Sequence, residues 1–250
     1  MTKKTEDFAK LHIPGNPLIL FNIWDAGSAV AVAKAGAKAI ATGSWGVAGA
    51  HGIGDGEKLP LDAAIATLTE VVAVTDLPVS IDMEAGYGKD AASVAASVQR
   101  AVDAGAIGIN LEDKDPATRA LFSVNDASAR IAAAAATGVF VNARADLFIL
   151  TAPAEHDAAL VDMLIERAKA YADAGARSLF APFLQDANLI ARLCAGSPLP
   201  VNILMRPGCP DHQTLAGLGV ARISHGHGPW AAAMDWLTGQ ARTALESVDK

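Results

Sequence analysis

Two short hydrophobic stretches of this sequence end in acidic side chains. The first, residues 78–84, contains Asp82 and Glu84, and the second, residues 108–112, ends in Glu112. Side chains two positions apart in a β-strand point to the same side, so we expect Asp82 and Glu84 to share a face. Three carboxylates meeting at one closed site repel each other strongly unless a positive charge lies between them. A divalent cation meets this need, and oxygen ligands without His or Cys favour Mg2+ or Mn2+ over Zn2+.

A purely structural explanation of these acids stays open at this point. Asp82 and Glu84 fit solvated positions at a strand end, and Glu112 fits an ion pair with Lys114 or Arg144. For any single acid the two explanations are equally good. The occurrence of all three acids at equivalent positions favours the shared metal site.

Other polar groups follow the neighbouring stretches. Residues 139–144 add Asn142 and Arg144, and residues 44–57 form a segment rich in glycine that we expect to be a loop. Glycine lets backbone N–H groups approach an anion closely, so this loop is suited to hold a substrate carboxylate. Asp55, within the loop, is placed either to reach the metal through water or to stabilise a tight turn.

Two further features carry less information. The segment His225-Gly226-His227-Gly228 offers histidines that either bind substrate or cap the following helix, and we favour capping. The lysines nearest to strand ends, Lys89 and Lys114, lie in loops, which disfavours an aldolase that uses a Schiff base.

Alternating short and long apolar segments must position these groups. Short runs of Ile, Val, Leu and Phe alternate with Ala-rich amphipathic segments, a pattern typical of parallel strands joined by crossover helices. The expected strands are residues 18–24, 39–44, 78–84, 108–112, 139–144, 178–182, 200–205 and 221–225. The expected helices are residues 28–35, 61–75, 91–104, 125–136, 155–174 and 230–247. The pattern predicts an α/β fold, a (β/α)8 TIM barrel, with residues 1–250 as a single domain and the chemistry at the C-terminal strand ends.

A weak internal repeat supports a barrel. The triplets around Gly36, Gly105, Gly175 and Gly219 each fit the end of a helix just before a strand, where glycine supplies a left-handed closing residue. An open doubly wound sheet is the alternative, but the first strand is not followed by a Gly-rich nucleotide loop.

Composition limits the classes of partner. With 52% hydrophobic and 19% charged residues in 250, the chain has enough apolar side chains for one large core. The net charge of -7 disfavours nucleic acid. No stretch is long and apolar enough for a membrane span, and the N-terminus carries charges where a secretion signal is apolar. Cys194 and Cys209 suggest no disulfide framework, so we expect a cytoplasmic protein.

The order of these motifs resembles the isocitrate lyase and phosphoenolpyruvate mutase superfamily. That family includes 2-methylisocitrate lyase, dimethylmalate lyase, phosphonopyruvate hydrolase and an oxaloacetate decarboxylase. The resemblance covers nearly the whole chain and rests on these segments: Asn22-Ile23-Trp24-Asp25-Ala26, the loop ending at Asp55, Asp82-x-Glu84-x-Gly86-Tyr87-Gly88, Gly108-Ile109-Asn110-Leu111-Glu112-Asp113, Asn142-Ala143-Arg144-Ala145-Asp146 and Val220-Ala221-Arg222-Ile223-Ser224. The resemblance implies a homo-oligomer, a tetramer or a dimer, and leaves an exchanged C-terminal helix open.

The resemblance also implies a metal site. It makes Asp82 the direct ligand of Mg2+ or Mn2+, with Asp55, Glu84 and Glu112 holding the ion mainly through water. Family members bind a small 2-oxo or 2-hydroxy carboxylate to this ion, and bond cleavage then generates an enolate that the metal stabilises.

The substrate-binding groups follow from the same resemblance. Backbone N–H groups of Ser44, Trp45 and Gly46 and the guanidinium of Arg144 are expected on the substrate carboxylate. We add Asn202, in the expected seventh strand, to the substrate-binding residues.

We assign the catalytic roles to Arg144, Asp55 and Lys114. Lys114 or Arg119 is suited to bind a distal carboxylate, and the alternative for both is a solvated charge in a loop.

The loop after the fourth strand departs from the family pattern. Isocitrate and methylisocitrate lyases carry a Lys-Lys/Arg-Cys-Gly-His motif there, with the cysteine as acid, whereas residues 114–120 contain neither Cys nor His. The longer Lys- and Asn-bearing loop of the phosphonate enzymes is also missing. We therefore predict a Mg2+-dependent lyase that cleaves a C–C bond by decarboxylation or retro-aldol cleavage. The alternatives are C–P bond chemistry and a non-catalytic barrel that binds a metabolite.

Overall fold

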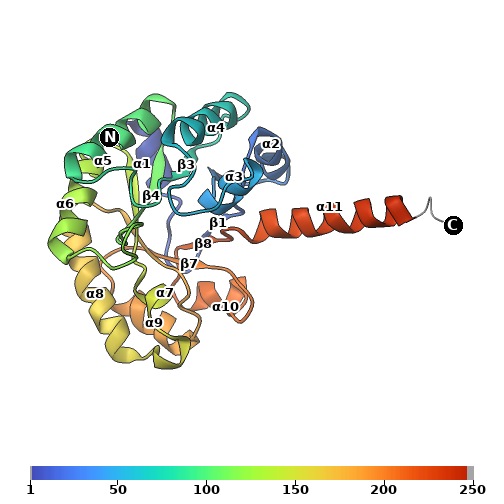
Figure 1. Ribbon diagram of the computed structural model, residues 1–250. Coiled ribbons are helices and arrows are strands. Elements are labelled where there is room, and N and C mark those ends of the chain that lie inside the picture. The colour runs from blue at the N-terminus through green and yellow to red at the C-terminus, as the bar shows by residue number, and fades with distance from the viewer. Residues whose placement is uncertain (1, 247–250) are drawn as a thin grey trace.

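The computed structural model describes residues 2–246 and shows eight parallel strands wound into a nearly closed barrel (Figure 1). The strands are β1 (Leu18–Leu20), β2 (Ile40–Ala41), β3 (Val79–Asp82), β4 (Gly108–Glu112), β5 (Phe140–Arg144), β6 (Ser178–Ala181), β7 (Val201–Leu204) and β8 (Arg222–Ser224). Strand β1 pairs with β8, and the order continues down to β2. A parallel bridge between Ile23 and Thr42 closes the remaining side. The (β/α)8 barrel is confirmed, and the open sheet is excluded.

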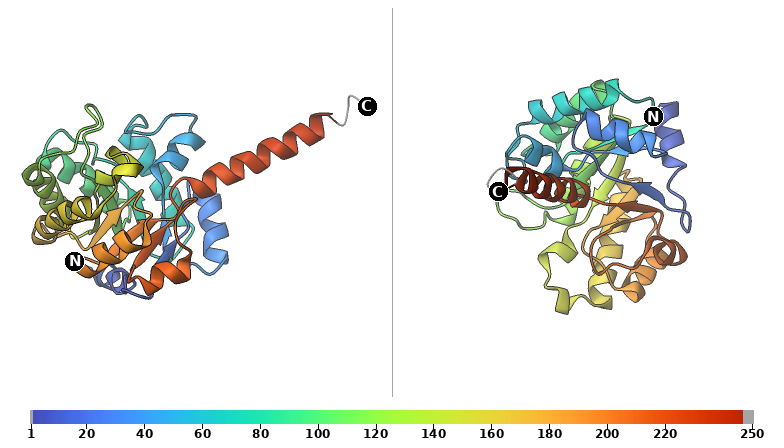
Figure 2. Two further views of the ribbon diagram at one scale, coloured as in Figure 1. Left: turned by 90° about the horizontal axis from the view of Figure 1, so that it is seen from below. Right: turned by 90° about the vertical axis from the view of Figure 1, so that its right-hand side faces the viewer.

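Helices surround the barrel and cover the outer faces of its strands (Figures 1 and 2). The helical segments are α1 (Lys3–Ala9), α2 (Ala26–Lys34), α3 (Ser44–Ala50), α4 (Leu61–Ala73), α5 (Ala91–Asp103), α6 (Val124–Ala135), α7 (Leu147–Leu150), η1 (Pro153–Glu155), α8 (Ala158–Asp173), α9 (Ala187–Gly196), α10 (His212–Gly217) and α11 (Gly228–Glu246). All six expected helices are present. The sequence did not predict α1, α3, α7, α9 and α10, because most of them are too short to show a clear helical period.

The helix ends follow local signals in the sequence. Asp90 accepts a hydrogen bond from the backbone of Ser93 at the start of α5, and Asp25 caps α2 in the same way. The four glycines of the repeat, at 36, 105, 175 and 219, all have positive φ, which confirms their role as left-handed residues after helices.

A ring of polar side chains fills the barrel interior below its mouth. We call it the inner polar layer, and its members are Asn110, Asn142, Ser178, Asn202, Arg222 and Ser224. Asn142 donates to Asn110 Oδ1 at 2.8 Å, and Ser178 donates to Asn142 Oδ1 at 2.6 Å. The guanidinium of Arg222, on β8, reaches Asn110 Oδ1 across the barrel at 3.2 Å. The layer therefore links β4, β5, β6, β7 and β8 through side chains.

The last helix, α11, projects away from the barrel, as Figure 1 and the left view of Figure 2 show. Its apolar side chains Trp236, Leu237 and Leu245 are exposed, Trp236 by 66%. None of the helices within residues 2–246 has the length and apolarity needed to cross a membrane.

Candidate active site

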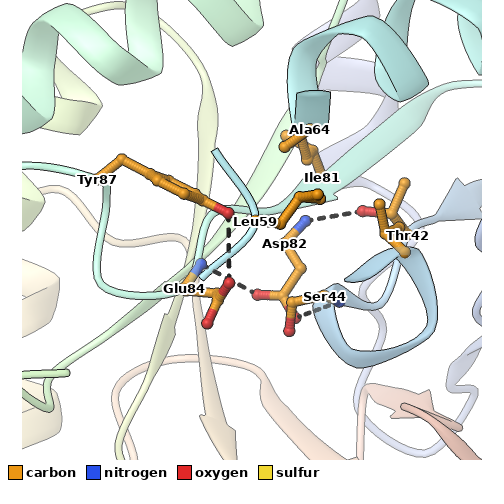
Figure 3. Close-up of a pocket in the computed structure, with 9 residues that line it drawn as sticks. Thr42, Ser44, Leu59, Ala64, Ile81, Asp82, Glu84 and Tyr87 are labelled. Atoms are coloured by element: carbon orange, nitrogen blue, oxygen red, sulfur yellow. Dashed lines mark hydrogen bonds between the residues drawn. The ribbon is translucent and has the colours of Figure 1, made fainter. Parts of the chain in front are cut away.

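Asp82 lies where the end of β3 meets the start of α3. Its Oδ2 accepts a hydrogen bond from the backbone N–H of Ser44 at 3.2 Å (Figure 3). Its own backbone N–H donates to Thr42 Oγ1 at 3.0 Å. These contacts fix the carboxylate at the C-terminal mouth of the barrel, as the strand pattern predicted.

Glu84 reaches the same mouth in a different way from the one we expected. Strand β3 ends at Asp82, and Glu84 has a φ of +48°, so the two side chains do not share a strand face. The expectation of a strand through residue 84 is wrong, because the chain turns into the left-handed region there. The Glu84 carboxylate accepts a hydrogen bond from the Tyr87 hydroxyl at 3.3 Å (Figure 3). It also accepts one from the backbone N–H of Glu57 at 2.7 Å.

Repulsion among the acids perturbs their ionisation. Burial, together with the charges of Asp55 and Asp82, raises the pKa of Glu84 to about 7. Burial and the charge of Asp82 also raise the pKa of Asp55 above its ordinary value. The charge of Asp82 therefore lies close enough to destabilise the charged forms of Asp55 and Glu84.

A second group of charges lies at the ends of β4 and β5. Arg144 contacts Glu112 at 2.6 Å through Nη1 and Asp146 at 2.6 Å through Nε. Lys114 pairs with Asp146, and its Nζ lies 3.4 Å from Glu112. The alternative in which Glu112 pairs with Lys114 or Arg144 is thus confirmed, and it pairs with both. Lys114 is not a solvated loop charge, whereas Arg119 is exposed.

Asp146 is a site residue to which our sequence analysis gave no role. Its side chain is 0% exposed and accepts hydrogen bonds from both Arg144 and Lys114. Burial alone would raise the pKa of Asp146, but Arg144 and Lys114 hold it below its ordinary value. Asp146 lies two residues after Arg144, and this spacing was the available signal.

A buried network supports this group from behind. The Asp113 carboxylate accepts hydrogen bonds from the Tyr171 hydroxyl at 2.6 Å and the backbone of Asp146 at 2.9 Å. Arg167 contacts the same carboxylate at 3.2 Å. Helix α8, which carries Tyr171 and Arg167, thereby fixes the loop that holds Asp146.

A cavity of about 210 Å3 opens at this mouth. Six of the predicted site residues line it, namely Ser44, Trp45, Asp55, Asp82, Lys114 and Arg144. The lining also includes Asn22, Asn110, Ser224, His227 and apolar residues that follow β5, β6 and β7. Glu84 lines a smaller pocket beside it, with Thr42 and Tyr87 (Figure 3).

Two predicted substrate-binding residues lie outside the cavity lining. Gly46 belongs to helix α3, and a Cβ there would lie 3.2 Å from Trp230 and 3.3 Å from Trp24. The expected Gly-rich loop thus begins as a helix, and Gly46 and Gly49 let this helix pack closely against Trp24 and Trp230. Asn202 is fully buried and donates to Ser224 Oγ at 3.1 Å, so it supports a residue that lines the cavity.

The histidines after β8 differ in their surroundings. His227 stacks on Trp45 with ring centroids 4.7 Å apart and lines the cavity. His225 lies outside the cavity lining, and its Nε2 is 3.2 Å from Nε2 of His212. Asn22 holds this segment, because its Oδ1 accepts hydrogen bonds from the backbone of His225 and Gly226 at 2.9 and 2.8 Å.

The donor set can be compared with the needs of a divalent cation. Within residues 2–246 no three His, Cys, Asp or Glu side chains are already gathered as a metal site. Burial and the charge of Asp82 nevertheless raise the pKa of both Asp55 and Glu84 at one mouth, and the donors of all three side chains are oxygens. A hard cation that compensates this repulsion therefore fits these residues.

Known proteins share this architecture. A family model described as phosphoenolpyruvate phosphomutase matches residues 8–245. The crystal structure of a candidate phosphonomutase from Burkholderia cenocepacia J2315 is 47% identical, with a TM-score of 0.94 over 97% of this chain and 98% of that one. An uncharacterized protein of Mycobacterium tuberculosis H37Rv is 37% identical over 91% of this chain and 84% of its own length. The 2-methylisocitrate lyase of Escherichia coli K12 is 31% identical over 76% of this chain and 69% of its own length.

Proposed function

Because the chain belongs to the phosphoenolpyruvate phosphomutase family, we propose that it is a Mg2+-dependent lyase acting on a small 2-oxo or 2-hydroxy carboxylate. The matches confirm the resemblance to the isocitrate lyase and phosphoenolpyruvate mutase superfamily, whose members are lyases and mutases. The main support for the proposal is that one cavity is lined by two acids, Asp55 and Asp82, and by two cations, Lys114 and Arg144. We propose that the bond cleaved is a C–C bond.

The acids at the mouth are the proposed metal ligands. Asp82 would bind the ion directly, and Asp55 and Glu84 would hold it mainly through water. Glu112 would also reach it through water while it stays paired with Arg144 and Lys114. When bound, Mg2+ supplies a Lewis acid for the substrate oxygens, and Mn2+ is the alternative ion.

The cations of the mouth are proposed to bind and orient the substrate. Arg144 presents a guanidinium whose position is fixed on two sides by Glu112 and Asp146. Its remaining donors, with the N–H groups of Trp45 and Gly46 in the first turn of α3, would hold the substrate carboxylate. Lys114, fixed by Asp146, would add positive charge where negative charge develops.

C–P bond chemistry is the second candidate. Its support is the 47% identical structure, described as that of a candidate phosphonomutase. The short loop after β4 argues against C–P bond chemistry. The same loop lacks the Cys and His of the methylisocitrate lyases, which argues against that particular C–C lyase activity. A non-catalytic metabolite-binding barrel is the third candidate.

We also propose that the protein is a homo-oligomer, a tetramer or a dimer. Support comes from α11, whose exposed Trp236, Leu237 and Leu245 would be covered by a neighbouring copy, with the helix exchanged. The cytoplasm remains the proposed compartment.

The experiment is a turnover assay on oxaloacetate, substituted malates and phosphonopyruvate, with and without EDTA. If the proposal holds, the protein releases pyruvate or glyoxylate from oxaloacetate or a substituted malate, and EDTA abolishes this turnover. Turnover of phosphonopyruvate alone would support the second candidate. No turnover, together with Mg2+-dependent binding of oxalate, would support the third.

A further inference from the structure

The cavity at the mouth of the barrel has two unlike sides. Charged residues that line it, Asp82, Lys114 and Arg144, come from the ends of β3, β4 and β5. Phe180 and Leu204 line it from β6 and β7. In the barrel order, β7 lies opposite β3, so Leu204 and Asp82 approach the cavity from opposite sides.

Six apolar side chains line the cavity from α3, from α7 and from the ends of β6 and β7. We call them the apolar wall, and they are Trp45, Ile149, Phe180, Pro182, Phe183 and Leu204. His227 extends it, because its ring stacks on Trp45. Such a surface binds alkyl or aryl groups and leaves a charged group without a partner.

The cations that line the cavity are already paired. Arg144 contacts both Glu112 and Asp146, and Lys114 contacts the same two acids. These four side chains carry two positive and two negative charges, so they compensate one another. One substrate carboxylate can be bound here beside a divalent cation, but the residues that line the cavity offer no further Lys or Arg to a second one. Arg206, whose guanidinium lies 3.8 Å from the centre of the Phe183 ring, is outside this lining.

From this arrangement, and on the premise of the proposed lyase function, we propose that the substrate is a 2-oxo-4-hydroxy monocarboxylate with an apolar group on carbon 4. Its carboxylate end would face Arg144, and its apolar end would face the apolar wall. A substrate with a second carboxylate at that end is disfavoured.

This substrate class selects one of the two reactions. Decarboxylation needs a second carboxylate that leaves as CO2, whereas retro-aldol cleavage does not. The bond between carbons 3 and 4 breaks, and its electron pair stays on carbon 3 as an enolate. The hydroxyl proton passes to water, and the far fragment leaves as an apolar aldehyde. Carbon 3 takes a proton from water to give pyruvate, and no oxidant or reductant is needed.

Binding tests the substrate class without requiring turnover. The dissociation constants of 2-oxo-4-methylpentanoate and 2-oxoglutarate are compared by calorimetry with the full chain in Mg2+. The two ligands share the 2-oxo acid end and differ in the far group. We expect the apolar ligand to bind at least roughly tenfold more tightly. Equal binding, tighter binding of 2-oxoglutarate, or no binding of either ligand would overturn the substrate class.

A variant of the apolar wall sharpens this test. Ile149 is partly exposed and lines the cavity, so Ile149→Lys adds a cation at the far end of the proposed substrate. We expect the preference to shift by at least roughly tenfold toward 2-oxoglutarate. Ile149→Leu and Leu150→Lys, the latter at an exposed neighbour outside the lining, should keep the wild-type preference. If Leu150→Lys shifts the preference as much as Ile149→Lys, the wall does not set specificity.

Turnover separates this inference from the proposed function. The pair 4-hydroxy-5-methyl-2-oxohexanoate and 4-hydroxy-2-oxoglutarate both release pyruvate by retro-aldol cleavage. Faster cleavage of the first supports the inference. Faster cleavage of the second, or turnover of oxaloacetate alone, overturns the substrate class and leaves the lyase proposal standing. No turnover of these acids or of the wider panel overturns the lyase proposal itself.

Discussion

The mouth of the barrel and the inner polar layer are built on the same strands but by different kinds of side chain. On β4, Asn110 lies in the layer and Glu112 lies at the mouth, two residues further on. On β5, Asn142 and Arg144 are related in the same way. On both strands, therefore, the inward-facing residue is a neutral amide in the layer and a charged residue two positions later at the mouth.

The difference separates stability from chemistry. In the inner polar layer, neutral amides and hydroxyls form hydrogen bonds with one another and with the guanidinium of Arg222, which stabilises the fold modestly. At the mouth, Asp55, Asp82 and Glu84 repel one another, which lowers stability and prepares a place for a cation. We therefore expect mouth variants to lose activity and layer variants to lose stability.

The sharpest form of this comparison is Asp82→Ala. We expect it to lower turnover by at least roughly a hundredfold, because the direct metal ligand is lost. The thermal unfolding temperature should stay the same or rise, because one repelling charge is gone. Turnover and thermal unfolding are measured on the same sample. Near-normal turnover in this variant would refute the site assignment.

Asp146→Ala should be an exception to this division, because Asp146 lies at the mouth and also stabilises the fold. It is fully buried between Arg144 and Lys114, so its removal takes away one of the two acids that these cations share. We expect a loss of about 3–5 kcal/mol in the free energy of unfolding, together with a loss of substrate binding. Denaturant unfolding checks the first effect. Arg192→Ala, which breaks the exposed pair with Asp162, should leave the free energy of unfolding nearly unchanged, because solvent screens this pair.

Asn142→Ala tests the inner polar layer. The side chain is fully buried, and its loss leaves the Ser178 hydroxyl without its acceptor. We expect the free energy of unfolding to fall by about 1–3 kcal/mol. The affinity for 2-oxo acids in Mg2+ should stay within a factor of about three, because Asn142 does not line the cavity. A tenfold loss of affinity with unchanged stability would show that the two regions are not separate.

Much of the fold could be predicted from the sequence. The eight strands and the closing glycines follow from periodicity and helix-end signals, which are local. Asp82, Arg144 and Lys114 were found because parallel strands bring their C-terminal ends to one face.

Other parts of the site depend on contacts that no local pattern reveals. The left-handed turn at Glu84 depends on Glu57 and Tyr87 from other segments, and helix α3 depends on Trp230 from the far end of the chain. The apolar residues that line the cavity, such as Ile149, look in sequence like any core residue. Tertiary packing decides these features.

The smallest expected effect is a pH dependence of the metal-free protein. The folded-state pKa of Glu84 is about 7, above the value of an unfolded glutamate, so the folded state binds more protons between these values. The free energy of unfolding should therefore fall as pH rises from about 4.5 to 7. Glu84→Gln should make this slope shallower, and Asn142→Ala should leave it unchanged. An equal slope in Glu84→Gln and wild type would show that Glu84 does not carry this titration.

Binding of oxalate tests the central claim of a cation held by carboxylates at the mouth most directly. Oxalate offers two adjacent carboxylates, as a small 2-oxo acid offers a carboxylate and a carbonyl. Calorimetry on the wild type and on Asp82→Ala, with Mg2+ and with EDTA, gives four affinities. We expect tight binding only for the wild type with Mg2+, and at least roughly a hundredfold weaker binding in the other three. Equal affinity of the wild type in Mg2+ and in EDTA would contradict a metal site at this mouth.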